Sequence, residues 1–220
     1  VKDGPSERRR FVDMALSQIR PTYYYALQRY ARALKQRNEL LRLGRLETLD
    51  SWDEQLAASG AEIMHGRYQY LDQLGAAAAA MHRDIADARE ALSIAYAPDV
   101  PDGDILRALK SSRTLDVRRM TTTAGVHRDD VSLLVGGREL RAYGSQGQQR
   151  TAALAIRLSE LGVIRAETGE PPVLLLDDVM SELDDDRRRL LVRGLGAAGQ
   201  ALITTTTTMY FTAAELAEAR

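Results

Sequence analysis

Two adjacent carboxylates stand at the end of an aliphatic run in the last third of the chain. Residues Val173 to Leu176 are followed at once by Asp177 and Asp178. An unbroken apolar run of this length predicts a buried strand of a parallel sheet, and α/β sheets bind ligands at the carboxyl ends of such strands. Buried carboxylates need partners, and Mg²⁺ binds through one or two carboxylates together with phosphate oxygens. The stretch therefore indicates a magnesium and phosphate site; a strand that ends in a solvated acidic turn is the alternative.

A second candidate site precedes a predicted helix. The segment from Gly144 to Gly147 contains two glycines that free the backbone, and Ser145 is a residue type that caps helix N-termini. The free N–H groups and the positive end of the helix dipole at such a turn suit an anion such as phosphate. A plain capping role for Ser145 explains the same residues without a ligand.

Strands and helices alternate around these two stretches. This order predicts a mostly parallel sheet covered by helices. We expect a strand at 131–135, a turn at Gly136-Gly137, a returning strand at 139–142, a helix at about 148–168, a strand at 173–176, a helix at 185–195, a strand at 201–205 and a last helix from 213.

An upstream zone, about 21–98, is predicted to be helical. Apolar residues recur there at spacings of three and four, and Arg37 takes one of the core positions. Gly44 interrupts the pattern, further turns are expected around Gly60, Gly66 and Gly75, and a second long antiparallel helix is predicted to start at a capping box of Ser51 and Glu54. A turn at 98–103 and another helix at 105–118 follow. The apolar stripe of the second helix contains Leu71, Leu74, Ala78, Met81, Ile85, Ala88 and Leu92.

Composition limits the possible functions. The 220 residues carry a net charge of −1, so a nucleic-acid surface must be a local patch. The absence of cysteine excludes disulfides and thiolate metal sites. The longest apolar run is far too short for a membrane span, and the polar first residues are not a secretion signal. We therefore expect a soluble cytoplasmic protein.

The motifs together resemble the head of an ABC-type ATPase. Ser-x-Gly-Gln at 145–148 is similar to the ABC signature, 173–178 to Walker B, and SELD at 181–184 to the D-loop, while 204–208 lies where the switch residue is found. Longer stretches resemble RecF, a bacterial recombination mediator related to SMC-type ATPases; one small departure is Val126, where that family usually has Pro. These stretches are GSQGQQRTAALAIRLSEL, LLLDDVMSELDDDRR, GVHRDD, GPSERRRFVD and LKQRNELL.

The resemblance implies a fold and a division of the chain. It implies an α/β fold, namely a partial ABC-type ATPase head with an inserted all-α helical arm. Residues 1–20 would be the tail end of the N-terminal ATPase lobe, and residues 21–119 a lid-like arm. Residues 120–220 would be the C-terminal ATPase lobe, which carries the signature, Walker B, the D-loop and the switch.

The resemblance also implies roles for single residues. ATP would lie between two subunits of an ATP-dependent homodimer, where each site combines Walker A and Walker B of one chain with the signature of the other. Asp177 would hold Mg²⁺, and Asp178 would polarise the attacking water. Ser145 and the Gly147 amide would bind the γ-phosphate of the partner's ATP. The remaining residues assigned in this way are Gly144, Gln146 and Gln148 in the signature turn, Thr205 or Thr206 as γ-phosphate sensor, and Ser181 and Asp184 at the dimer seam.

DNA is the partner that the resemblance implies, in the form of duplex next to a single-stranded gap. RecO and RecR are the implied protein partners, in DNA repair, recombination, replication and the SOS response. The alternative for the cations is a solvated face or pairing with the chain's acids. The candidate phosphate contacts are Arg8, Arg9, Arg10, Lys35 and Arg37, with Arg42 and Arg45 on the same helical zone.

The printed residues contain no Gly-x-x-x-x-Gly-Lys-Ser/Thr, the loop that cradles phosphates and supplies a lysine. In the RecF family this loop lies in an N-terminal lobe, upstream of the point where the sequence begins. We therefore expect a weak ATPase only when the protein is complete, and no ATP hydrolysis by these 220 residues alone. The competing hypothesis is a non-catalytic DNA or protein interaction module with an incomplete ATPase head. Another SMC-like ATPase with a truncated coiled coil is disfavoured by GVHRDD and GSQGQQR.

Overall fold

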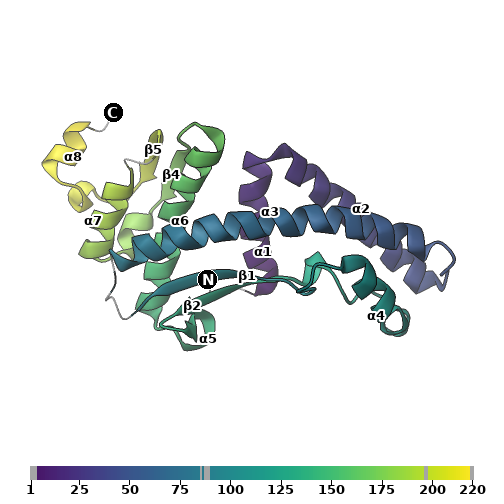
Figure 1. The fold of residues 1–220 in the computed structure, drawn as a ribbon. Helices are drawn as coiled ribbons and strands as arrows, with labels where there is room; N and C mark the ends of the chain where they lie inside the picture. The colour runs from purple at the N-terminus through teal and green to yellow at the C-terminus, as the bar shows by residue number, and fades with distance from the viewer. Residues whose placement is uncertain (1–3, 85, 87–89, 196–197, 219–220) are drawn as a thin grey trace.

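The computed structural model describes residues 4–84, 86, 90–195 and 198–218. In chain order the elements are α1 (Pro5–Ile19), α2 (Pro21–Leu43), α3 (Leu49–Arg83), β1 (Leu92–Ala97), α4 (Ile105–Arg119), η1 (Val126–Arg128), β2 (Asp130–Val135), β3 (Arg138–Glu139), α5 (Leu140–Tyr143), α6 (Gln146–Thr168), β4 (Val173–Asp177), η2 (Val179–Glu182), α7 (Asp185–Gly194), β5 (Gln200–Thr204), η4 (Thr208–Tyr210) and α8 (Ala213–Glu218). The long helix α3 connects the two ends of the molecule. α2 and α4 lie along one end of it, and α6, α7, β4 and β5 lie at the other (Figure 1).

α2 and α3 form the predicted pair of long antiparallel helices (Figure 1). The predicted stripe of α2 is buried at Tyr23, Tyr30 and Leu41, and Gly44 ends the helix in a left-handed cap with φ 67°. The expected turns within the second helix are wrong, because α3 continues through all three of its predicted breaks. Glycine there allows close packing instead: a Cβ on Gly66 would lie 2.7 Å from Cδ2 of Tyr23.

Both predicted ends of the second helix also need correction. The capping box is wrong, since α3 begins at Leu49, and Ser51 and Glu54 lie inside the helix. The helical assignment of Leu92 is wrong as well, because this residue begins β1 and its side chain is buried on one face of a strand. The alternation in LSIAYA is a strand signal that outweighs the continued spacing of the stripe. Ile85 and Ala88 lie outside the described residues.

The described strands form two sheets. β1, β2 and β3 form an antiparallel sheet in that order, and β4 pairs with β5 in parallel. The hairpin turn at Gly136-Gly137 is confirmed, with φ 57° and 76°. Its predicted return at 139–142 is wrong beyond Glu139, because the chain turns into α5 and buries Leu140 completely. The parallel arrangement thus holds for the two strands that carry the motifs, and the other three strands are antiparallel.

α6 lies between two hydrophobic clusters. The larger cluster packs α1, α2, α3, β1, β2 and α5 together, and α6 adds residues such as Ala152 and Ile156 to it. The smaller cluster contains Leu158, Met180 and Leu191 and joins α6, η2 and α7 to one face of the β4–β5 pair. In the part of the chain that the structure describes, no helix has both the length and the apolar character that a bilayer span requires.

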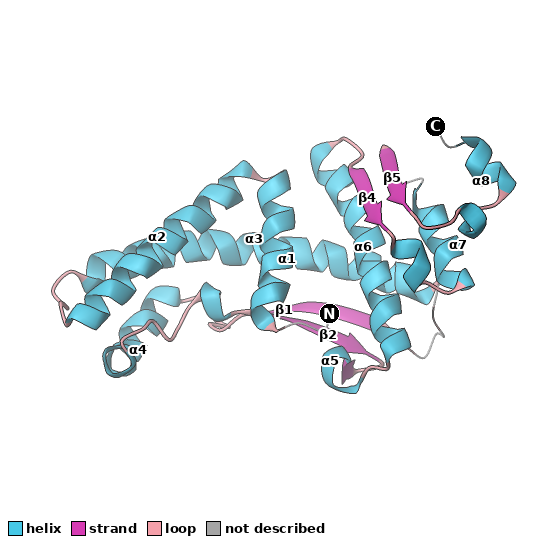
Figure 2. Ribbon diagram, turned by 180° about the vertical axis from the view of Figure 1, so that it is seen from behind, coloured by secondary structure: helices cyan, strands magenta, loops and turns pink. Residues whose placement is uncertain are grey.

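The other face of β4 and β5 is bare. The inward side chains of both strands pack on α6 and α7, which lie beside them in Figure 2. The outward ones are exposed: Val173 by 58%, Leu175 by 71% and Leu202 by 54%. The helices of the described residues therefore cover this sheet on one side only, where the sequence predicted cover on both.

Candidate functional site

The carboxylate pair lies at the carboxyl end of β4, as the sequence predicts. The parallel register places Asp177 opposite Thr204, the last residue of β5. The Thr204 hydroxyl donates to Oδ1 of Asp177 at 2.5 Å, and the Asp178 N–H donates to both the carbonyl and the hydroxyl oxygen of Thr204, at 3.2 and 3.0 Å. These bonds fix the first carboxylate and the backbone of the second against the end of β5.

Asp178 adopts a left-handed backbone conformation, which aspartate tolerates better than most residues with a Cβ. Its φ of 47° is left-handed, which costs a residue with a Cβ roughly 1–2 kcal/mol. The Ser181 hydroxyl stabilises the turn by donating to the carbonyl oxygen of Asp178 at 2.8 Å and to Oδ2 at 3.1 Å. Oδ1 of Asp178 is buried and has no hydrogen-bond partner among the described residues. A buried carboxylate oxygen without a donor is costly, so this atom is an exception that the packing of the described residues does not explain.

The carboxylate end fits Mg²⁺ without being a complete site for it. No group of three or more His, Cys, Asp or Glu residues that could hold a metal occurs within the described ranges. Asp177 and Asp178 supply hard oxygen donors, and Oδ1 of Asp178 lacks a partner. This matches the preference of Mg²⁺ for one or two carboxylates with the remaining positions filled by water and phosphate.

The signature turn is a capping box at the start of α6. Oγ of Ser145 accepts from the N–H of Gln148 at 3.2 Å, and the Gln148 side chain accepts from the N–H of Ser145 at 2.8 Å. The predicted capping role of Ser145 is therefore confirmed. The Gln148 amide nitrogen also donates to Glu90 at 2.9 Å, which ties the turn to the segment before β1.

The two glycines of this turn differ in whether the surrounding chain leaves space for a Cβ. A Cβ on Gly144 would lie 2.5 Å from the carbonyl oxygen of Leu140, so packing within the chain requires glycine there. A Cβ on Gly147 would meet nothing closer than 3.5 Å, where it would touch the Arg187 side chain. Nothing in the described chain therefore requires glycine at 147, and a ligand that approaches the backbone would explain its presence.

Ser181 in η2 and Asp184 at the start of α7 lie on the exposed stretch that follows the carboxylate pair. Asp184 caps α7 by accepting from the N–H of Arg187 at 3.0 Å, and this hydrogen bond lowers the pKa of the Asp184 carboxyl. No hydrogen bond or ion pair between described residues joins Ser145 or Gly147 directly to the carboxylate of Asp177 or of Asp178. The structure thus shows the signature turn and the carboxylate end as two separate groups, which α7 links.

Thr204 is a residue that the sequence predictions missed. Thr205 donates to the carbonyl oxygen of Thr207 at 3.0 Å, and Thr206 is exposed. Only Thr204 of this run contacts Asp177. Its place at the end of an aliphatic strand that runs parallel to 173–177 could have identified it, because residues that end adjacent parallel strands lie side by side. The role of Thr205 or Thr206 as γ-phosphate sensor stays a prediction.

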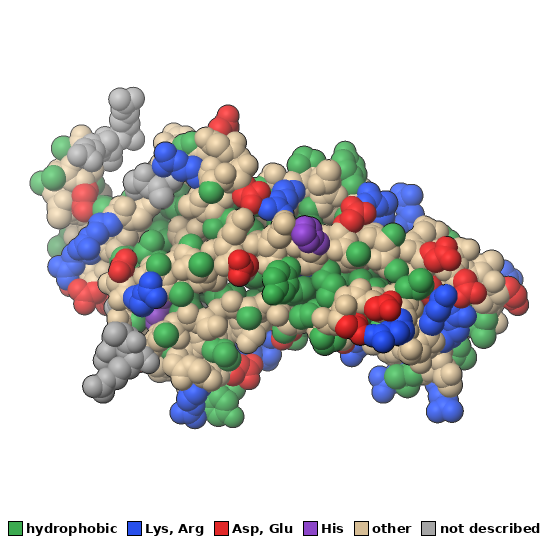
Figure 3. Space-filling view, in the orientation of Figure 1, with side chains coloured by type: hydrophobic (Ala, Val, Ile, Leu, Met, Phe, Trp, Pro, Cys, Tyr) green, Lys and Arg blue, Asp and Glu red, His purple; other side chains and the backbone are tan. Residues whose placement is uncertain are grey.

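The predicted DNA contacts need larger corrections. Arg37 is wrong as a surface contact: it is fully buried and donates to Asp53 at 2.6 Å and to Asp116 at 2.7 Å. Its position in the apolar stripe predicted burial, and this prediction is confirmed in place of the DNA contact. Lys35 is exposed and has no partner among the described residues. Figure 3 shows Lys and Arg side chains interspersed with acids around the α2–α4 end of this face, rather than one continuous basic patch.

The arginine run at the start of α1 is mostly engaged inside the chain. Arg8 pairs with Asp130 at 2.7 Å, and Arg9 donates to the carbonyl oxygen of Asp129 at 2.6 Å. Arg8 and Arg9 are therefore structural contacts, not the free phosphate ligands that the sequence suggested. Arg10 is exposed, and its nearest acid is Glu7 at 3.8 Å.

The GVHRDD segment is a structural junction. Arg67 of α3 is 3% exposed and donates to Asp129 at 2.8 Å and to both oxygens of Asp13 in α1 at 2.9 Å. Burial raises the pKa of Asp129. His127 lies 2.8 Å from the Tyr30 hydroxyl, and burial lowers the pKa of its imidazole. The segment thus joins α1, the helical arm and the antiparallel sheet.

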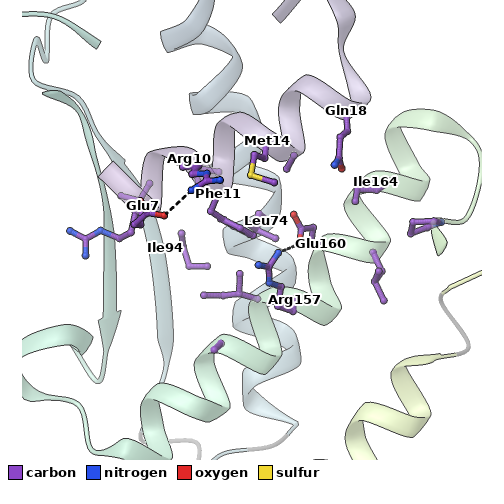
Figure 4. Close-up of a pocket in the computed structure, with 18 of the residues that line it drawn as sticks. Glu7, Arg10, Phe11, Met14, Gln18, Leu74, Ile94, Arg157, Glu160 and Ile164 are labelled. Atoms are coloured by element: carbon purple, nitrogen blue, oxygen red, sulfur yellow. Dashed lines mark hydrogen bonds and ion pairs between the residues drawn. The ribbon is translucent and has the colours of Figure 1, made fainter. Parts of the chain in front are cut away.

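A cavity of about 660 Å³ is lined in part by the candidate DNA contacts Arg8 and Arg10, but not by Asp177, Asp178 or the turn at 144–148. It opens between α1, α3, α6 and the strands, and it is lined mainly by apolar side chains such as Phe11, Met14 and Ile94 (Figure 4). Arg157 lies over the Phe11 ring, 4.7 Å from its centroid, and pairs with Glu160 at 3.0 Å.

Comparison with known sequences identifies relatives. No protein-family model matches the chain. It is 45% identical over 196 residues to the DNA replication and repair protein RecF of Alkaliphilus oremlandii (strain OhILAs), which covers 84% of this chain and 54% of that protein. It is 41% identical over 235 residues to RecF of Shouchella clausii (strain KSM-K16), which covers 100% of this chain and 63% of that protein. The chain therefore spans little more than half the length of these relatives.

Comparison with solved structures agrees. A structure described as the recombination mediator protein RecF with ATPγS in the RecFOR pathway has a TM-score of 0.86 at 39% identity, and covers 96% of this chain and 60% of that one. A RecF–ATP structure has a TM-score of 0.84 at 37% identity, with 94% and 59% covered. These matches confirm the α/β ATPase-type fold that the sequence predicted. The domain boundaries near residues 20 and 119 stay predictions.

Proposed function

We propose that this chain, a homologue of RecF over the part of the RecF sequence that it spans, forms part of a DNA-repair ATPase of the RecFOR type. In this proposal it supplies the signature turn, the Walker B carboxylates and the D-loop. The protein acts in the cytoplasm, in DNA replication, recombination and repair. It binds DNA at junctions of duplex and single strand, and it works with RecO and RecR.

One observation carries the proposal. Asp177 and Asp178 are presented at the end of a parallel strand pair, with the first bonded to Thr204 and the second left with a buried, unpartnered oxygen. Such an arrangement is stable when a water molecule or a cation supplies the missing partner. Phosphoryl transfer needs these elements, since its catalysis is mainly positioning and charge neutralisation.

The residues have distinct tasks in this proposal. Asp177, oriented by the Thr204 hydroxyl, holds Mg²⁺, which neutralises charge on the phosphates when bound. Oδ1 of Asp178 accepts a hydrogen bond from the attacking water and orients it. Ser145 and the Gly147 amide contact the γ-phosphate of ATP held by a second subunit, because helix N-termini favour anions. ATP therefore favours the dimer by binding to both chains at once.

In this proposal, exposed cationic side chains on or next to the N-terminal helices contact DNA. Of the predicted contacts, Arg42 and Arg45 remain exposed, and so do Arg10 of α1 and Lys35 of α2. Each phosphate contact adds to the salt dependence of binding. Replacing any of these residues is therefore expected to weaken DNA binding equally on all sequences and to reduce the salt slope.

The test is ATP turnover by the longest native chain that contains these residues. Asp178→Asn keeps the shape of the side chain and removes its charge, and turnover is expected to fall about 100-fold or more. Asp186→Asn is the matched control, since Asp186 is an exposed acid in the first turn of α7 and belongs to neither group. Equal activity of the Asp178→Asn and unmodified proteins would contradict the assignment. If neither turns over ATP, the interaction-module hypothesis takes its place.

A further inference from the structure

The three consecutive arginines of α7 have different surroundings. Arg189 pairs only with Asp186, and both side chains are exposed. Arg188 donates to the carbonyl oxygen of Met180 at 2.9 Å and lies over the Tyr210 ring, 4.2 Å from its centroid. Arg187 turns the other way, toward α6. Two neighbouring arginines thus fasten α7 to different elements: Arg187 to α6, and Arg188 to η2 and η4.

Arg187 bonds to the signature helix through two of its nitrogens. Nε and Nη2 donate to the Thr151 hydroxyl oxygen at 2.9 and 2.7 Å, and Nη2 also lies 3.1 Å from the carbonyl oxygen of Gly147. The Thr151 hydroxyl in turn donates to the same carbonyl at 2.9 Å. Thr151 is 5% exposed, so these bonds lie in a largely water-free place where charge-assisted hydrogen bonds are strong.

The third nitrogen of Arg187 bonds to the D-loop. Nη1 pairs with the carboxylate of Asp184, the residue that also caps α7. One planar guanidinium therefore holds the first turn of α6 and the end of the SELD segment in a fixed relation. A lysine has a single nitrogen on a flexible stem and could not make this set of contacts.

We propose that Arg187 is a positioning residue that couples the two ATP sites of a dimer. This rests on the proposed function, in which a chain's signature turn contacts the partner's ATP while its carboxylates serve its own. Because Arg187 and Arg188 link these two groups within one chain, closure of one site shifts the residues that complete the other. Coupling of this kind appears as cooperativity in ATP concentration.

Two substitutions break the link from opposite sides. Arg187→Met removes the guanidinium, and Thr151→Val removes the hydroxyl that accepts from two of its nitrogens, which leaves the Gly147 carbonyl as its acceptor on α6. Arg189→Met is the matched control on the same helix, since Arg189 touches neither candidate group. If Arg187→Met fails to fold, Thr151→Val keeps the proposal testable.

The measurement is ATP turnover against ATP concentration in the longest native chain, together with ATP-dependent dimerisation by sedimentation. We expect a Hill coefficient above one for the unmodified protein and for Arg189→Met. We expect a lower coefficient for Arg187→Met and Thr151→Val, with dimers still formed at saturating ATP. A role confined to the stability of α7 would lower the melting temperature and leave the Hill coefficient unchanged.

The outcomes separate this proposal from the function it rests on. If the unmodified protein dimerises with ATP and hydrolyses it, but its Hill coefficient is one or is unchanged in both variants, coupling through Arg187 is overturned and the proposed function stands. If the unmodified protein shows no ATP-dependent dimer, both are overturned.

Discussion

At the scale of residues, the fate of each charged side chain depends on whether the fold gives it a partner. Arg37 lies in an apolar stripe and is fully buried between Asp53 and Asp116. Asp178 is buried in part and has one oxygen without a partner. Nη2 of Arg37 also lacks a hydrogen-bond partner among the described residues, so what distinguishes Asp178 is its place beside a second carboxylate at the end of a parallel strand.

Removing Arg37 is expected to destabilise the helical arm. Arg37→Met leaves Asp116 buried without its cation and Asp53 with Arg113 alone, and breaking a buried ion network from one side costs about 3–5 kcal/mol. Lys35→Met on the exposed face of the same helix is the control, with an expected change within about 0.5 kcal/mol. Urea denaturation measures both. A smaller loss for Arg37→Met than for Lys35→Met would show that the network contributes nothing.

Residue types at motif spacing were predictable, and contacts across the fold were not. The capping role of Ser145 follows from local sequence alone, because its partner is three residues away. Other contacts join residues far apart in the chain. Thr204 bonds to Asp177, and Arg8 pairs with Asp130. Nothing in local spacing records such contacts, so Thr204 was missed and Arg8 was assigned to DNA.

At the scale of elements, α3 decides the shape of the molecule. It is a single helix of 35 residues that passes through Gly60, Gly66 and Gly75. Glycine is a poor helix former, which is why the sequence suggested turns there. The helix continues because tertiary packing against α2, α4 and β1 outweighs propensity. Each of the three glycines lies where another element comes too close for a Cβ.

A methyl group at one of these contacts is expected to destabilise the protein. Gly66→Ala brings a Cβ to 2.7 Å from the buried Tyr23 ring, and such overpacking costs typically about 1–3 kcal/mol. Gly162→Ala in α6 is the matched control, because nothing lies within 4 Å of its Cβ position. There the better helix propensity of alanine is expected to stabilise by up to about 1 kcal/mol. Thermal unfolding distinguishes the two, and equal signs would contradict the packing account.

At the scale of the whole molecule, the GVHRDD junction makes stability depend on pH. Burial lowers the pKa of His127 below its ordinary value of 6.5, and the same holds for His82 beside Glu90. His127 is surrounded by the Tyr30 hydroxyl, the Thr122 carbonyl, Arg128, Asp99 and Arg9. The folded state therefore binds fewer protons on these imidazoles than the unfolded chain does near pH 6.5.

The free energy of unfolding is expected to fall as pH is lowered from about 7.5 to about 5.5. The contribution of each neutral imidazole is fully present above the unfolded pKa and is lost as pH drops through the depressed folded value. His127→Gln removes the titrating group and is expected to flatten this dependence. Exposed His65 on α3, replaced by Gln, is the control. If His127→Gln has the same pH slope as the unmodified protein, burial of this imidazole is not the cause.

The bare face of β4 and β5 also belongs to this scale. Val173, Leu175 and Leu202 are more than half exposed, although they lie on strands that the sequence marks as buried. An apolar run indicates a buried strand without showing which of its faces is covered, and within the described residues helices pack against one face of β4 and β5 only.

The most direct test of the account is sedimentation of the longest native chain carrying Asp178→Asn, with and without Mg²⁺ and ATP. The carboxylate change blocks turnover and leaves the signature turn intact, so the account predicts a shift from monomer to dimer on addition of ATP. Gly147→Ala in the same background is expected to abolish the shift while the chain stays folded, since a Cβ there would lie 3.5 Å from the Arg187 side chain and 3.8 Å from the Ser145 hydroxyl oxygen, both ordinary contacts. A protein that stays monomeric with ATP, or one whose dimer tolerates Gly147→Ala, would contradict the central claim.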